Sequence, residues 1–197
     1  MKTKTIIFDA DGMIIHGERF SKRLASDFGI SIDVIDPFFK KEFQLCLIGQ
    51  ADLKEELSKV LEVWGWKKSL DDLLDFWFKE EYNRIDERFR PSIEQLRNNE
   101  VKVYLATNNE KYRTDNLINE RGLGKLFNKV FSSAYIGSKK PDPLFFQHIL
   151  DNTGIEKDTT VYWDDDMENI NGAKKFGFKA EVYKDFEQYK KTIEELF

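Results

Sequence analysis

From residue 89 onward, short apolar runs alternate with segments whose apolar residues recur at helical spacing. The apolar runs predict strands, and the segments between them predict helices. The expected strands are 101–106, 129–132, 159–163 and 179–183, and the expected helices are 92–98, 110–120, 143–151, 169–176 and 185–196. Strands that alternate with helices form βαβ units, so this part of the sequence predicts an α/β fold with a doubly wound parallel sheet.

A further buried strand is expected at the start of the chain, over 5–8. This apolar run leads directly into Asp9-Ala10-Asp11-Gly12, two carboxylates separated by one residue and followed by a glycine that allows a turn. In open α/β sheets, the carboxyl ends of the strands are where ligands bind. Placing acidic side chains there is unfavourable, because they lose hydration and repel each other. Their presence therefore indicates a functional role.

Residues 17–88 interrupt the alternation of strands and helices. No convincing strand pattern occurs there, whereas four stretches have amphipathic helical spacing, at about 19–28, 34–43, 52–64 and 70–85. We therefore expect a helical insert at 17–88, and an α/β core made of 1–16 and 89–197.

The bulk composition narrows the class of protein. The 197 residues carry a net charge of −5, which argues against nonspecific nucleic-acid binding. Apolar runs are too short for a membrane span, and the N-terminal residues lead straight into a strand without a signal peptide, so a cytoplasmic protein is expected. Cys46 is the only cysteine and lies among apolar residues, which predicts a buried, inert thiol.

Polar side chains follow four of the expected elements of the core. Asp9 and Asp11 follow the first strand, Thr107 and Asn108 follow 101–106, Lys140 lies beyond 129–132, and Asp164 and Asp165 follow 159–163. Each group alone has an ordinary explanation as a turn, a helix cap or a solvated loop. Because parallel strands end at one edge of the sheet, the combination instead predicts a single shared site.

The chemistry of these residues indicates a cation and a phosphoryl group. Carboxylates that arrive from two strand ends would repel each other unless a cation lies between them, and hard oxygen ligands suit Mg²⁺. A lysine and a hydroxyl beside that ion suit the oxygens of a phosphoryl group. The expected partner is a small phosphorylated substrate.

The four groups together resemble the motifs of the haloacid dehalogenase-like hydrolase superfamily. Asp9-Ala10-Asp11-Gly12 matches the first motif, Thr107 the second, Lys140 the third, and Asp164-Asp165 followed by Glu168-Asn169 resembles the fourth. The resemblance covers nearly the whole chain and implies a Rossmann-like core. The insert at 17–88 is similar to the α-helical cap of some members, including the loop Gly49–Leu53.

The resemblance implies a role for each of these residues. Asp9 would be the nucleophile that forms an aspartyl-phosphate, and Asp11 the general acid and base. Mg²⁺ would be held by Asp9, the backbone carbonyl of Asp11 and Asp165, with Asp164 as a ligand or a partner of one. Thr107, Asn108 and Lys140 would bind phosphate oxygens.

Asp11 favours a phosphatase over a dehalogenase, because a halide leaves without a proton whereas an alkoxide needs one. A phosphomutase on the same scaffold and a noncatalytic module that binds a phosphorylated ligand remain as alternatives. Two further residues are open at this point. His16 is expected to bridge insert and core rather than to contact substrate, and Trp163 either fills the sheet or narrows the metal end of the site.

Overall fold

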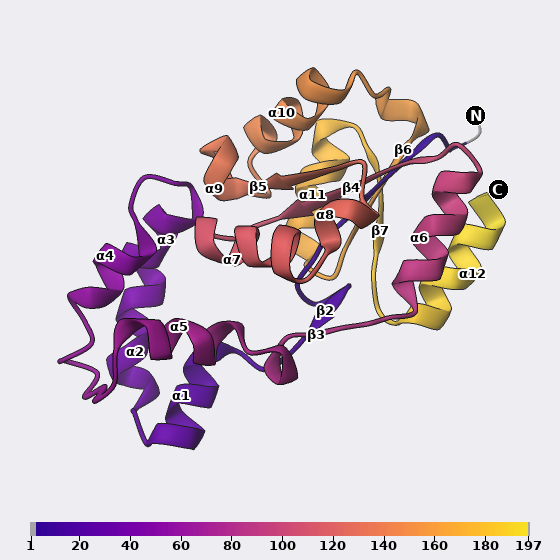
Figure 1. Ribbon diagram of the computed structural model, residues 1–197. Helices are drawn as coiled ribbons and strands as arrows, with labels where there is room; N and C mark the ends of the chain where they lie inside the picture. The colour runs from indigo at the N-terminus through magenta and orange to yellow at the C-terminus, as the bar shows by residue number, and fades with distance from the viewer. Residues whose placement is uncertain (1–2, 197) are drawn as a thin grey trace.

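A five-stranded parallel sheet forms the centre of the computed structural model, which describes residues 3–196 (Figure 1). The strands lie in the order β5-β4-β1-β6-β7, so the N-terminal strand is central. In register, Ile7 of β1 lies between Tyr104 of β4 and Tyr162 of β6. The strand bounds are β1 (Thr5–Phe8), β4 (Lys102–Thr107), β5 (Lys129–Ser132), β6 (Thr160–Asp164) and β7 (Lys179–Val182).

Helices cover both faces of this sheet, which confirms the predicted α/β class. One face carries α6 (Phe89–Asn98), α8 (Leu123–Leu126) and α12 (Phe186–Leu196), and the other carries α10 (Pro143–Thr153) and α11 (Met167–Phe176). The remaining core segments are α7 (Lys111–Asp115), which continues into a π-helical turn (Asn116–Glu120), α9 (Ser133–Ile136) and a 3₁₀ turn (Lys157–Thr159).

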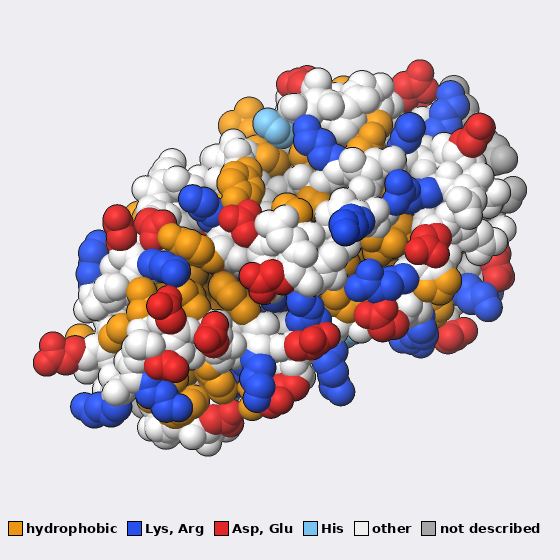
Figure 2. Space-filling view, in the orientation of Figure 1, with side chains coloured by type: hydrophobic (Ala, Val, Ile, Leu, Met, Phe, Trp, Pro, Cys, Tyr) orange, Lys and Arg blue, Asp and Glu red, His pale blue; other side chains and the backbone are white. Residues whose placement is uncertain are grey.

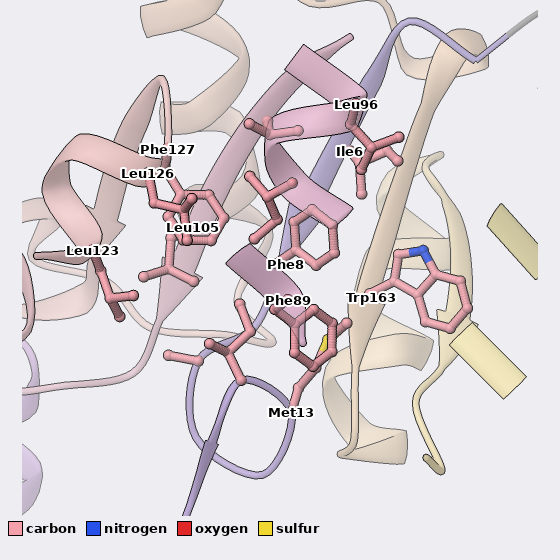
Figure 3. Close-up of a cluster of buried hydrophobic side chains, with 14 of the residues drawn as sticks. Ile6, Phe8, Met13, Phe89, Leu96, Leu105, Leu123, Leu126, Phe127 and Trp163 are labelled. Atoms are coloured by element: carbon pink, nitrogen blue, oxygen red, sulfur yellow. The ribbon is translucent and has the colours of Figure 1, made fainter. Parts of the chain in front are cut away.

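Alternation along the buried strands divides the core into two layers. Ile6 and Phe8 point into the cluster under α6 and α12, whereas Ile7 points into the cluster under α10 and α11. Figure 3 shows the first cluster, in which Phe8, Phe89 and Trp163 pack together. Because β1 is buried on both faces, its sequence is continuously apolar and its carboxyl end is rigidly placed.

The insert forms a separate group of helices beside the sheet, coloured indigo to purple in Figure 1. Its helices are α1 (Phe20–Phe28), α2 (Ile32–Lys40), α3 (Glu42–Leu47), α4 (Leu53–Ser58) and α5 (Leu70–Phe78). They share a hydrophobic cluster of their own, rich in aromatic side chains such as Phe20, Phe38 and Trp64. Most of these aromatic side chains therefore form the hydrophobic core of the insert.

Three of the four helices expected in the insert are shorter in the structure than predicted. The segment 34–43 breaks at Lys41 into α2 and α3, α4 ends at Ser58 rather than near Trp64, and α5 ends at Phe78. The last segment also contains a 3₁₀ turn (Glu80–Tyr82) and a strand, β3 (Arg84–Ile85). Apolar spacing alone continues through such breaks, because turns that remain packed on the same core keep their apolar side chains.

The expectation that the insert contains no strand was wrong. β3 pairs antiparallel with β2 (Ile15–His16), with Ile15 opposite Ile85. This short ribbon joins the two ends of the insert to the core. Strands of two residues are too short to show the alternation by which strands are recognised.

At the start of α6 the helix begins at Phe89, earlier than the expected Ser92, with Pro91 in its first turn. Proline is tolerated there because its missing N–H would have no partner in the helix. Among residues 3–196, no helix has the length and apolarity that a membrane crossing needs. On the face drawn in Figure 2, acidic and basic side chains are interspersed.

Candidate active site

The loop after β1 brings both of its acids to the carboxyl edge of the sheet. Asp9 donates its backbone N–H to Trp163 O of β6 at 2.8 Å, so its position is fixed by the neighbouring strand. The loop then turns tightly, with Gly12 at φ +94°. A Cβ atom on Gly12 would lie 2.0 Å from Oδ2 of Asp165. Acidic loops from opposite ends of the chain are therefore in direct contact, and only glycine leaves room for both.

Three carboxylates gather at this point. One oxygen each from Asp9, Asp164 and Asp165 lies within 4.8 Å of the others. Asp9 and Asp164 are buried, whereas Asp165 is exposed at the rim. Burial raises the pKa of Asp9 well above its ordinary value, and the charge of Asp164 adds to the effect, while Lys140 opposes it. A buried group of hard oxygen donors with this repulsion fits a divalent cation such as Mg²⁺.

Lys140 lies between two of these acids with its ammonium completely enclosed. Its Nζ donates to Oδ1 of Asp9 at 2.5 Å, to Oδ2 of Asp164 at 2.9 Å and to the carbonyl of Ala106 at 2.9 Å. Burial opposes the positive charge, but the two carboxylates outweigh burial and raise the pKa of Lys140. Lys140 is therefore a fixed cation beside Asp9.

Asn108 contacts Lys140 through its side chain. Its Nδ2 donates to the Lys140 carbonyl and its Oδ1 accepts from the Lys140 N–H, both at 2.9 Å. This pair of hydrogen bonds locks the loop that carries the lysine. The side-chain amide of Asn108, a residue predicted to contact phosphate, is thus engaged in placing Lys140.

Thr107 and Asp11 are connected by Asn109, a residue to which no role was assigned from the sequence. Nδ2 of Asn109 donates to Oγ1 of Thr107 and to Oδ2 of Asp11, at 2.6 Å each. The second predicted motif therefore lies beside the first, as expected. Asn109 is adjacent to the predicted Thr107-Asn108, and its place at a strand end is the signal that could have identified it.

Arg113 is a second residue that the sequence analysis missed. It lies one helical turn beyond Asn109, on α7, and is 4% exposed. Its Nη2 lies 3.5 Å from Oδ1 of Asp11. Asp11 is thus held from two sides, although its own side chain remains half exposed. The two residues are 102 positions apart in the chain, so no local pattern could have linked them.

Asp164 has every lone pair directed at a donor. Besides Lys140, it accepts from the hydroxyl of Tyr162, the backbone N–H of Asp166 at 2.8 Å, and Nδ2 of Asn169 at 3.1 and 3.2 Å. Asp164 therefore holds Lys140 and the loop in place, and one of its oxygens also lies within 4.8 Å of oxygens of Asp9 and Asp165. Asp165 has no such set of donors among the described residues.

Three further residues that the sequence singled out can now be placed. Trp163 packs into the core against Tyr189, with ring centroids 5.3 Å apart, so it fills the sheet and does not narrow the site. Cys46 is buried, and burial raises the pKa of its thiol to about 12, as expected for an inert cysteine. His16 lies in the ribbon opposite Arg84, near the ring of Tyr183, and it also lines the cavity beside Asp11.

A cavity of about 290 Å³ opens beside Asp11. Its walls come from both parts of the chain: Asn109 and Arg113 from the core, and Phe20, Phe43 and Trp77 from the insert. The exposed carboxylate of Asp11 is therefore placed where the insert and the core together enclose a small volume.

Comparison with known proteins identifies the fold and the family. A family model described as haloacid dehalogenase-like hydrolase matches residues 6–182. Among curated proteins, a phosphatase of Mycobacterium tuberculosis is 33% identical over 92 residues, or 46% of this chain and 42% of the relative. A sesquiterpene phosphatase of Aspergillus oryzae is 31% identical over 94 residues, or 48% of each chain. The aligned part is thus less than half the length of these relatives.

Solved structures match over nearly the whole chain. A predicted HAD-like family hydrolase from Porphyromonas gingivalis has a TM-score of 0.82 at 22% identity, covering 100% of this chain and 98% of its own. A HAD family enzyme from Bacteroides thetaiotaomicron, in complex with magnesium and inorganic phosphate, has a TM-score of 0.81 at 19% identity, covering 95% and 98%. The L-2-haloacid dehalogenase of Xanthobacter autotrophicus is less similar, with a TM-score of 0.67 at 18% identity, covering 98% and 83%. Because the family model matches residues 6–182, which is most of this chain, the chain belongs to the haloacid dehalogenase-like hydrolases.

Proposed function

We propose that this hydrolase is a Mg²⁺-dependent phosphatase that cleaves a small phosphate monoester through an aspartyl-phosphate on Asp9. The observation that carries the proposal is Asp11, held by Asn109 and Arg113 two residues beyond Asp9 and facing the cavity. A departing alkoxide needs a proton, and Asp11 lies where it could supply one. A departing halide has no use for such a group.

In the first step, a carboxylate oxygen of Asp9 bonds to phosphorus while the ester P–O bond breaks, and Asp11 gives its proton to the leaving oxygen. In the second, Asp11 takes a proton from a water molecule, whose oxygen attacks the phosphorus and releases phosphate and the restored Asp9. Thr107 binds a phosphoryl oxygen. Lys140, whose three donors are directed at Asp9, Asp164 and the Ala106 carbonyl, offsets the charge of Asp9 as the dianionic substrate approaches.

The metal set of this proposal is Asp9, Asp165 and the backbone carbonyl of Asp11. When bound, Mg²⁺ supplies charge neutralisation between the nucleophile and the phosphate. Asp164 supports this set through Lys140 and the loop of Asp165 rather than as a principal ligand.

The insert at about 17–88 serves as a cap over this site, joined to the core at the β2–β3 ribbon. Beyond the ribbon, the insert contacts the core at the Gly49–Leu53 loop. Asp52 accepts from the Tyr112 hydroxyl at 2.8 Å, and a Cβ atom on Gly49 would lie 2.2 Å from the Ala134 carbonyl. A cap that closes the volume beside Asp11 would restrict water and select the leaving group.

The relatives support a phosphatase, since two of the curated matches carry that name and a structural neighbour was solved with magnesium and phosphate. A direct test is hydrolysis of p-nitrophenyl phosphate with and without Mg²⁺. We expect turnover that EDTA abolishes, complete loss in Asp9→Asn, and a loss of about 10²- to 10⁴-fold in Asp11→Asn. Turnover that is independent of metal, or unchanged in Asp11→Asn, contradicts the proposal.

A further inference from the structure

Two guanidinium groups are buried at the cavity beside Asp11, one from each part of the chain. Arg23 of α1 is 2% exposed and Arg113 of α7 is 4% exposed. Both line the cavity. Burial lowers the pKa of each guanidinium, and the nearby charge of Arg113 lowers the pKa of Arg23 further. Burying two like charges around one small volume is unfavourable unless an anion offsets them.

The acidic side chains at the cavity are Asp11, Glu18 and Glu110, and of these three only Asp11 pairs with either guanidinium, at 3.5 Å from Arg113. Glu18 lies exposed at its mouth, where solvent screens its charge. Glu110 is buried, but both of its oxygens accept backbone N–H groups at the start of α7, from Tyr112 at 2.7 Å and Arg113 at 2.6 Å. Burial raises the pKa of Glu110 to about 7, so its charge is itself reduced near neutral pH.

The two guanidinium groups differ in how many of their hydrogen-bond donors have acceptors. Arg23 donates to three backbone carbonyls, those of Glu18, Phe76 and Trp77, which fixes it as a structural cation. Arg113 has a single partner at 3.5 Å, the half-exposed Asp11, and its buried Nη1 has no hydrogen-bond partner among residues 3–196. Arg113 is therefore the group with unused donor capacity.

The opposite wall is apolar. The rings of Phe20 and Trp77 are stacked, with centroids 4.2 Å apart, and Phe43 packs against Trp77. The volume of about 290 Å³ suits a short carbon skeleton with one polar end. Because Arg113 lies against Asp11, that polar end must be only a few bonds from the ester oxygen that Asp11 protonates.

We propose that Arg113 recognises a carboxylate on the leaving group, so that the preferred substrate is a small phosphate monoester with a carboxylate near its ester oxygen. This inference rests on the proposed phosphatase function. A carboxylate matches the planar fork of a guanidinium in shape and charge. It also neutralises the positive potential that Arg23 and Arg113 create together.

The test compares two esters that differ in one group, at one concentration of Mg²⁺. In 3-phosphoglycerate a carboxylate replaces the neutral hydroxymethyl group of glycerol 3-phosphate. We expect kcat/KM to be at least tenfold higher for 3-phosphoglycerate. Arg113→Gln should reduce the ratio of the two values to less than threefold, and Arg113→Lys, which keeps the charge but not the fork, should give an intermediate ratio. Arg88→Gln, on the surface away from the cavity, should leave the ratio unchanged.

A measurement on the unaltered protein covers the case in which the Arg113 variants do not fold. With p-nitrophenyl phosphate as substrate, glycerate should inhibit at concentrations at least tenfold lower than glycerol. Equal use of the two esters or equal inhibition, in a protein that hydrolyses p-nitrophenyl phosphate, overturns this inference and leaves the phosphatase standing. Failure to hydrolyse any of the three esters overturns both.

Discussion

Replacing Gly12 by alanine tests whether the two acidic loops form one metal site. The new Cβ would lie 2.0 Å from Oδ2 and 2.4 Å from Cγ of Asp165, distances that force the carboxylate to move. The φ of +94° adds backbone strain of about 1–2 kcal/mol. Disturbing the support of a metal ligand typically costs 10- to 100-fold in affinity, so the Mg²⁺ concentration for half-maximal activity should rise by at least about tenfold, or about 1.4 kcal/mol.

Gly122→Ala is the matched control. Gly122 has a φ of +73°, and a Cβ atom there would meet no described atom within 4 Å. Both variants should be less stable in urea than the unaltered protein, because both carry backbone strain at a positive φ. Only Gly12→Ala should need more Mg²⁺ in a titration of p-nitrophenyl phosphate hydrolysis. Equal Mg²⁺ requirements in the two variants would refute the placement of Asp165 at the metal.

Three further predictions concern burial. Trp163→Ala should lower the free energy of unfolding by about 3–5 kcal/mol, because the side chain is fully buried. Val63→Ala, at a side chain 72% exposed, should change it by less than about 0.5 kcal/mol. Similar losses for the two variants in urea melts would contradict the assigned core. Cys46 should react with a thiol reagent only after denaturation, since its pKa is raised to about 12 by burial, and rapid labelling of the folded protein would oppose this. Burial raises the pKa of Glu110 from 4.5 to about 7, so its stabilising contribution is fully present below about pH 4.5 and is lost as pH rises through about 7. Relative to Glu110→Gln, wild-type stability should therefore fall by up to about 3 kcal/mol across that window, and a rise would contradict the sign.

Most of the core could be predicted because its strands are buried on both faces. The run Thr5–Phe8 is continuously apolar for that reason, and the acids that follow it necessarily lie at the edge where β4 and β6 also end. Asp9, Thr107, Lys140 and Asp165 could thus be assigned to one site before any coordinates were known. The insert was harder, since the break at Lys41 and the β2–β3 ribbon leave no periodic signal.

The residues that the sequence did not reveal are those defined by tertiary contact. Arg113 reaches Asp11 only because α7 starts directly after β4, the neighbour of β1. Tyr162 was expected only as part of a buried strand, yet its hydroxyl donates to Asp164 two residues further along the same face. Asn108 illustrates the opposite case. It is in the predicted place, but its side chain supports Lys140 rather than pointing freely into the site.

The central claim is that the carboxylate of Asp9 becomes bonded to phosphorus during turnover. The most direct measurement is a single turnover of Asp11→Asn with radiolabelled p-nitrophenyl phosphate and Mg²⁺, quenched in acid and followed by peptide mapping. Nitrophenolate leaves without a proton from Asp11, whereas hydrolysis of the intermediate still needs Asp11 as the base. We predict label on the peptide that contains Asp9, and none when EDTA is present or when Asp9→Asn is added. Turnover in the unaltered protein with no protein-bound phosphate, or with label on a different residue, would contradict the account.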